Sequence, residues 1–127
     1  MTNKEFVNYE IALALKELGF DESCLRFWYS TPFDKPYLVK PGDLGCDQQG
    51  YIRAPLFQQT FRWFREKHGL LGVLCNINNP NTGWSFDINK LTGGILFLWD
   101  VTMTPYKTYE EAQVACLEEL IRIVEEL

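Results

Sequence analysis

The sequence lacks the long apolar run that a membrane-spanning protein needs. A helix crosses a bilayer with about 18–20 apolar residues, whereas the densest apolar run of this chain covers only residues 95–99. Glu5 and Glu10 interrupt the segment where a signal peptide would have its apolar core. We therefore expect a cytoplasmic protein that makes no contact with a membrane.

Clustered metal ligands are also missing. The chain has one histidine and four cysteines, and no two cysteines form a Cys-x-x-Cys pair. A zinc site needs several such ligands at short spacing, so the sequence predicts no metal site and no bound cofactor. Disulfides are not expected in a chain without an export signal. Cys75 and Cys116 lie in apolar patterns and are interpreted as small core residues.

Positive charge is scarce, and aromatic residues are abundant. The 12 Lys and Arg residues face 17 Asp and Glu residues, which gives a net charge of −5. This balance argues against a protein that coats nucleic acid, although a local basic patch is compatible with it. Aromatic side chains make up 15% of the 127 residues. The length and composition predict one globular domain over residues 1–127.

Apolar residues at helical spacing predict three helices. Thr2 followed by Glu5 matches a capping box at the start of the first helix, and Gly19 is placed to end it. Thr108 and Glu111 form a second such pattern before the last helix. The helices expected on these grounds cover residues 3–18, 55–68 and 109–127.

Alternating or continuous apolar runs predict the strands. The run 95–101 is almost wholly apolar, which is typical of a central strand covered on both faces. The resulting order αβ(β)αβββα predicts an α+β fold, in which about three helices pack on a small antiparallel sheet. That sheet is a three-stranded meander with one or two additional short strands. The strands expected are residues 25–30, 37–39, 73–77, 84–88 and 95–101.

Two segments carry a resemblance to a known group of proteins. One is the stretch from Ala54 to Gly69, in which a proline-initiated helix has Trp63, Phe64 and Arg65 at its centre. The other is Tyr106–Ala112, where the sequence Tyr-Glu-Glu-Ala marks the start of the last predicted helix. Together they resemble small proteins of unknown function from bacteriophage, prophage and other mobile elements of Bacteroidetes-type gut bacteria. The resemblance implies an intracellular accessory protein of a mobile element, from a group with no known catalytic residues.

The sharpest local cluster is Arg62, Trp63 and Arg65. Arginines on phosphates and a tryptophan stacked on a base would bind nucleic acid. The two arginines, however, lie on one flank of the predicted helix and Trp63 lies about 100° away. The alternative interpretation, which we favour, makes Trp63 part of the buried face and leaves the arginines in solvent. A second group of candidate binding residues surrounds the irregular segment 31–50, namely Trp28, Phe33 and Tyr37.

The last helix carries a second apolar stripe beside its main one. The stripe either packs against another helix of the chain or forms an association surface. Its members are Val114, Leu117, Ile121 and Val124.

Catalytic residues are hard to find in this sequence. Asp34, Asp43, Asp47 and Cys46 share the irregular segment, and His68 is the single residue that titrates near neutral pH. Aspartates also favour turns, and a histidine in a last helical turn serves packing or capping. We therefore expect no enzymatic activity, and keep a small enzyme with a cleft under the 31–50 loop as the third hypothesis.

The leading hypothesis is a non-enzymatic accessory or interaction protein of a phage or mobile element. It would act by binding a protein, either a second copy or a host or phage protein. The second hypothesis is a nucleic-acid-binding accessory protein that uses Arg53, Arg62, Arg65 and Lys67.

Overall fold

The computed structural model describes residues 3–43, 50–77, 83–98 and 105–127. The fold is α+β, as predicted, and divides into two compact units, Met1–Thr60 and Phe61–Leu127. The expectation of one globular domain over residues 1–127 stays a prediction. The elements are α1 (Tyr9–Glu17), β1 (Phe27–Tyr29), β2 (Tyr37–Val39), β3 (Tyr51–Arg53), α2 (Phe57–His68), β4 (Leu70–Ile77), β5 (Gly83–Lys90), β6 (Ile95–Leu98) and α3 (Tyr109–Glu125), with 3-10 turns at Asn3–Glu5 and Pro41–Asp43.

The first unit combines α1 with a three-stranded antiparallel sheet in the order β2-β1-β3. Residues 51–53, expected as a lead into the second helix, form its third strand. Trp28 lies opposite Leu38 and Ile52, so these three side chains share one face. Ile52 is buried, and the Trp28 indole Nε1–H donates a hydrogen bond of 2.9 Å to the carbonyl of Val7. This face therefore packs towards the N-terminal segment and α1.

The first helix starts later than its sequence pattern suggests. Its N-cap is Asn8, whose Oδ1 accepts a hydrogen bond of 2.8 Å from the amide of Ile11. The expected start at Asn3 is wrong, because Phe6 forms an antiparallel bridge with Leu56 and is held extended. Thr2, the expected cap, lies outside the described residues. The end at Gly19 is confirmed by its left-handed φ of +96°.

The second helix matches the prediction closely. It covers Phe57–His68 and ends at Gly69, whose φ is +65°. The boundary between the two units falls inside this helix, between Thr60 and Phe61. Thr60 is fully buried, and its hydroxyl donates to the carbonyl of Leu56 at 2.9 Å.

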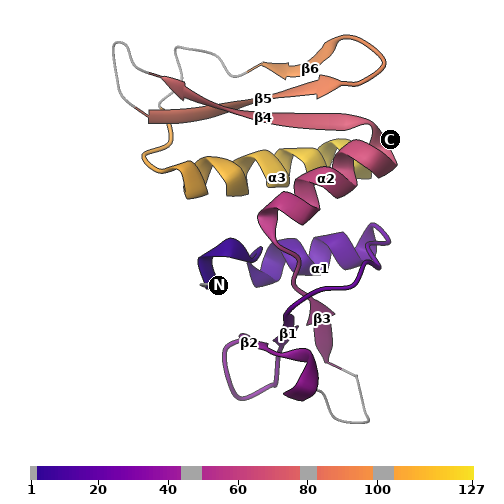
Figure 1. The fold of residues 1–127 in the computed structure, drawn as a ribbon, viewed down its shortest axis with the longest axis vertical. Coiled ribbons are helices and arrows are strands. Elements are labelled where there is room, and N and C mark those ends of the chain that lie inside the picture. Colours follow the sequence, from indigo (N-terminus) through magenta and orange to yellow (C-terminus); the bar gives the residue numbers. More distant parts are fainter. Residues whose placement is uncertain (1–2, 44–49, 78–82, 99–104) are drawn as a thin grey trace. The chain divides into compact units, whose positions relative to one another are not determined.

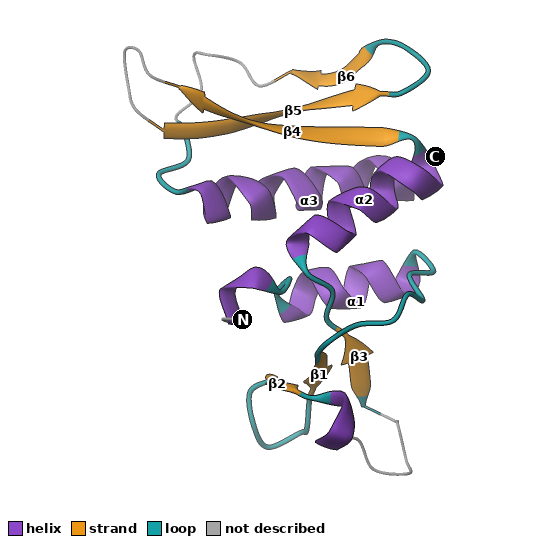
Figure 2. Ribbon diagram, viewed as in Figure 1, coloured by secondary structure: helices purple, strands orange, loops and turns teal. Residues whose placement is uncertain are grey.

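The second unit is an antiparallel meander in the order β4-β5-β6 with helices against it. Figure 1 shows α3 running along one face of this sheet, and Figure 2 shows the same layering by element type. Gly72 on β4 lies between α2 and α3, because a Cβ there would meet Phe61 and Cys116. Thr108 caps α3 as predicted, since its hydroxyl accepts a hydrogen bond of 3.1 Å from the amide of Glu111.

The expected central strand is an edge strand. β6 pairs with β5 alone among the described residues, so β5 is the middle strand. Leu96 on β6 is 47% exposed, whereas Phe86 and Ile88 on β5 are buried. An apolar run therefore misled the prediction, because the position of a strand depends on its pairing partners. Residues 99–101 of the predicted strand lie outside the described residues.

The extra short strands also form a sheet of their own instead of extending the meander. In the part of the chain that the structure describes, no helix is long and apolar enough to span a membrane.

Candidate functional site: an aromatic face on the small sheet

The outer face of the β2-β1-β3 sheet is unusually aromatic. Residues two apart on a strand share a face, and the register sets Tyr29 opposite both Tyr37 and Tyr51. In the next row, Phe27 lies opposite Val39 and Arg53. We call this surface the tyrosine face; its six residues are Phe27, Tyr29, Tyr37, Val39, Tyr51 and Arg53.

The three tyrosine rings form a continuous row across the strands. The rings of Tyr29 and Tyr51 stack with centroids 4.6 Å apart and an interplanar angle of 27°. The Tyr29 and Tyr37 rings meet edge to face at 5.7 Å and 79°. Such contacts contribute roughly 0.5–1.5 kcal/mol each beyond the area they bury, so the row is a preorganised surface.

The backbone pattern explains why Tyr29 and Tyr51 stack. The amide of Ala54 donates a hydrogen bond of 3.1 Å to the carbonyl of Arg26, so Arg26 and Ala54 are a hydrogen-bonded pair. Pair types alternate along an antiparallel ladder, which makes Trp28 and Ile52 the next hydrogen-bonded pair. Tyr29 and Tyr51 are then a non-hydrogen-bonded pair. Such pairs bring their side chains closest together across an antiparallel ladder.

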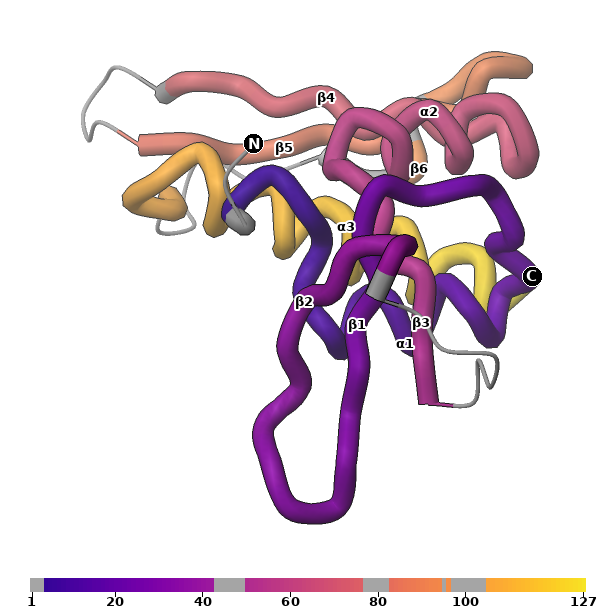
Figure 3. The backbone as a smooth tube through the Cα atoms, turned by 60° about the horizontal axis from the view of Figure 1, so that its bottom comes forward, coloured from indigo at the N-terminus to yellow at the C-terminus, as the bar shows by residue number. Residues whose placement is uncertain are grey.

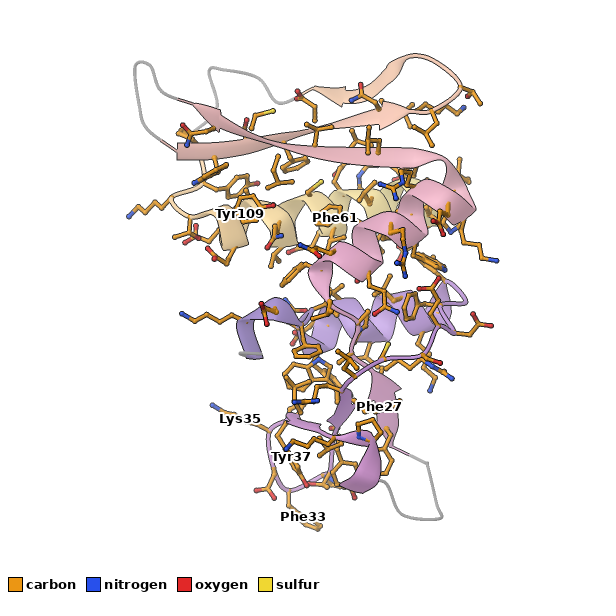
Figure 4. All side chains as sticks on the ribbon, viewed as in Figure 1. Phe27, Phe33, Lys35, Tyr37, Phe61 and Tyr109 are labelled. Atoms are coloured by element: carbon orange, nitrogen blue, oxygen red, sulfur yellow. The ribbon has the colours of Figure 1, made fainter. Side chains whose placement is uncertain are left out.

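The hairpin that joins β1 to β2 extends the aromatic surface. Figure 3 shows this connection projecting away from α1, and Figure 4 shows the ring of Phe33 at its end, pointing outward. Phe33 is 92% exposed and Tyr37 is 48% exposed. The tip is shaped locally by the hydroxyl of Thr31, which accepts a hydrogen bond of 3.2 Å from the amide of Asp34. Together with the tyrosine row, Phe33 enlarges a contiguous exposed apolar patch, and such patches mark contact surfaces.

Two hollows lie along β3. The larger, of about 370 Å³, runs from Tyr9 and Lys16 of α1 to Gly50 and Ile52, and reaches Ser30–Pro32. The smaller, of about 60 Å³, is lined by Ala12, Lys16, Phe20, Tyr51, Ile52 and Arg53. Of the described residues in these linings, Lys16 and Arg53 are the charged ones, and both are exposed.

Burial disfavours ionisation of the Cys24 thiol beside the sheet. Burial raises the pKa of Cys24 to about 11, against a smaller opposing effect of the Arg53 charge. A thiol with this pKa stays protonated near neutral pH and is a poor nucleophile. Among residues 3–43, 50–77, 83–98 and 105–127, no group of three or more acidic, histidine or cysteine residues could hold a metal ion.

Trp28 and Trp63, both named as candidate binding residues, have structural roles. Trp28 lies on the sheet face opposite the tyrosine face, where it meets the ring of Tyr9 edge to face at 6.3 Å. Trp63 is 3% exposed and contacts Phe64 and His68 at 5.1 and 4.9 Å. Its ring is not accessible to a base. The interpretation of Trp63 as part of the buried helix face is thereby confirmed.

The basic residues of the nucleic-acid hypothesis belong to different units. Arg53 is exposed on β3 in the first unit, whereas Arg62, Arg65 and Lys67 are exposed on α2 in the second. Trp63 is buried, so its ring is not available to stack on a base beside the helix arginines. Nucleic-acid binding by these four residues stays a prediction.

The second stripe of α3 is not a free association surface. Leu117 is fully buried and Ile121 is 7% exposed, while Val114 and Val124 are partly exposed. The stripe is therefore interior at its centre and partly exposed at its two ends. Cys116 of the main stripe is buried as expected.

The candidate catalytic residues do not form a described site. Cys46 and Asp47 lie outside the described residues, as does the side chain of Asp43, and Asp34 is exposed. His68 packs on Trp63 and Phe64, which confirms its packing role. Burial, and then the charge of Lys67, lowers the pKa of His68, which favours the neutral ring over a cationic helix cap.

Sequence reasoning found Phe33 and Tyr37 but missed Tyr29 and Tyr51 as their neighbours. The signal was present in part, because Tyr29 and Tyr37 each have an aromatic or β-branched residue two positions away, Phe27 and Val39, whereas Tyr51 has Arg53 at that spacing. Reading it requires the strand register, which the sequence does not display. No family model, curated protein or solved structure matches the chain.

Proposed function

We propose that this protein is a non-enzymatic interaction protein that binds a protein partner through the tyrosine face and Phe33. The observation that supports this proposal most directly is the continuous aromatic row beside Phe33, which is 92% exposed. Tyrosine, phenylalanine and arginine are enriched in protein–protein interfaces, where rigid rings bury area at little entropic cost. Here the rings already hold one another in place before any partner arrives.

The resemblance described above supplies the biological setting of the proposal. An accessory protein of a phage or mobile element acts inside the bacterial cell, on a host protein, a phage protein or a second copy of itself. A binding surface without catalytic groups suits that role, since such proteins redirect other machinery by occupying it. Cytoplasmic location is part of this proposal.

A photo-crosslinking experiment tests the proposed surface. Benzoyl-phenylalanine replaces Phe33 in the full chain, and in a matched control it replaces the exposed Lys90 at the end of β5. Both proteins are irradiated in a lysate of the bacterium that encodes them. We expect a discrete protein adduct at position 33 and none at position 90, because Phe33 adjoins the tyrosine face of the first unit and Lys90 belongs to the sheet of the second.

Competition makes the result specific. An excess of the unmodified chain should suppress the adduct, whereas an excess of Tyr29→Ser or Tyr37→Ser, each verified as folded by circular dichroism, should not. Adducts that disappear after nuclease treatment would replace the proposal with the nucleic-acid hypothesis. Equal adducts at positions 33 and 90, or none at position 33, would refute it.

A further inference from the structure

The free edge of β3 presents ordered main-chain groups. β3 is outermost in the order β2-β1-β3. Because Trp28 and Ile52 form a hydrogen-bonded pair, the amide and carbonyl groups of Tyr51 and Arg53 point away from β1. Within the described residues no strand pairs with this side of β3. Four main-chain groups in strand geometry are the template that an added strand uses.

The chain itself already uses the continuation of this edge. Two residues beyond Arg53, the carbonyl of Pro55 accepts a hydrogen bond of 3.0 Å from the amide of Val7. Phe6 and Leu56 form the adjoining antiparallel bridge. The N-terminal segment thus pairs at this end and then turns into α1 at the Asn8 cap. The pairing stops short of Tyr51 and Arg53.

The space beside these groups is hollow rather than filled. The pockets of about 60 and 370 Å³ share Lys16, Tyr51 and Ile52 in their linings, so both border the same stretch of β3. Ala12 and Phe20 contribute apolar walls to the smaller one. The larger one offers hydroxyl groups from Ser30 and Thr31.

The charged residues that line the two pockets favour a negatively charged ligand. Among the described residues of the two linings, Lys16 and Arg53 are the ionisable groups other than tyrosine, and both are exposed cations. A segment placed along β3 would bring its side chains within reach of one or both. A carboxylate there gains charge-assisted hydrogen bonds, whereas a cation is repelled.

We infer that the partner contributes an extended acidic segment, which adds as a strand to the free edge of β3 and places a carboxylate against Lys16 or Arg53. Main-chain hydrogen bonds to Tyr51 and Arg53 give the pairing, and the two cations give the preference for acidic sequences. This inference rests on the proposed function, since the added strand continues the sheet whose outer face the partner contacts.

A displayed library of random decapeptides supplies the probe. It is selected on the full-length protein, and the most enriched peptide is synthesised. We expect the enriched sequences to carry Asp or Glu between β-branched residues. In amide hydrogen exchange, saturating peptide should slow Tyr51 and Arg53 at least tenfold. The amide of Leu38 is the internal control, because the same register points it outward from β2, the opposite edge of the sheet.

Two variants of the complex test the two parts of the inference. N-methylation of the peptide at its pairing amides should weaken binding at least tenfold, because it removes main-chain donors without changing side chains. Lys16→Glu and Arg53→Glu should weaken binding at low salt, and the loss should shrink as salt rises. Glu10→Lys, an exposed charge change on α1 outside both linings, should leave binding unchanged.

The outcomes separate this inference from the proposed function. Enrichment of basic or proline-rich peptides, protection at Leu38 instead of Tyr51 and Arg53, or no enrichment at all would overturn the added strand. The crosslink at position 33 would then still decide the proposed function by itself. Conversely, edge protection without any crosslink would leave the strand pairing intact and refute the aromatic contact.

Discussion

Replacing Gly72 by alanine should destabilise the second unit. A Cβ at this position would lie 2.8 Å from the Sγ of Cys116 and 3.1 Å from the Cε1 of Phe61. Cys116 is fully buried, so its sulfur has no open space into which it can move. Overpacking of a filled core costs about 1–3 kcal/mol, and the reduced freedom of the unfolded chain returns about 0.4–1 kcal/mol. The net loss should be about 1–2 kcal/mol of unfolding free energy.

The second half of the test is a double-mutant cycle with Cys116→Ala. Removing the sulfur alone should cost about 1 kcal/mol, since it leaves a small void. In the double variant the new methyl group occupies part of that void. The two effects should therefore combine to less than their sum, with a coupling of about 1 kcal/mol in favour of the pair.

Urea unfolding followed by tryptophan fluorescence measures all four proteins of the cycle. Gly42→Ala is the matched control, because a Cβ there meets no atom within 4 Å and the residue lies in the first unit. It should change the unfolding free energy of the second unit by less than about 0.5 kcal/mol. A Gly72→Ala protein as stable as the parent, or strictly additive effects in the cycle, would refute the packing argument.

Three further outcomes follow from the same structure. Gly83→Ala should lower the unfolding free energy more than Gly72→Ala in the same urea assay. Its Cβ would lie 2.6 Å from the ring of Pro105 and 3.0 Å from the backbone carbonyl oxygen of Tyr106, and a backbone atom cannot be removed by a side-chain deletion. An equal or smaller loss of unfolding free energy would contradict this. The pKa of His68 is lowered in the folded state, so the unfolded chain binds a proton at this residue at higher pH than the folded chain does. The unfolding free energy should therefore fall as the pH drops below about 6.5. His68→Gln should flatten that part of the pH profile, and an unchanged slope would contradict the role given to His68. The pKa values of Cys24 and Cys116 are raised to about 11 and about 12. Both thiols should therefore react with iodoacetamide at pH 8 at least about tenfold more slowly than a free thiol. Mass spectrometry of each peptide measures the labelling, and rapid labelling of either thiol would contradict its burial.

Local signals in the sequence predicted the elements that local chemistry determines. Gly69 ends α2 and Thr108 caps α3 because each feature depends on a few neighbouring residues. The predicted start of α1 was wrong because a distant contact determines it. The capping pattern at Thr2 was plausible locally, but the pairing of Phe6 with Leu56 holds the chain extended until Asn8. A contact across fifty residues overrides a local helix signal, and periodicity does not reveal it.

The candidate site shows the same division more sharply. Phe33 was identifiable from its irregular, proline-rich surroundings, and its exposure agrees with that expectation. Trp28 was indistinguishable from Tyr29 in the sequence, because adjacent residues of a strand point to opposite faces and the sequence does not say which face is covered. The row of Tyr37, Tyr29 and Tyr51 exists only once the register of three strands is known.

The stacked tyrosines also make the proposed contact surface its own optical reporter. Aromatic chromophores 4.6 and 5.7 Å apart couple their transitions, so the row should give a near-ultraviolet circular dichroism signal that single tyrosines lack. A difference spectrum between the parent chain and Tyr51→Leu isolates that signal from the tryptophans. Any partner that seats on the row must alter the coupling, and occupancy of the surface can then be followed without a label.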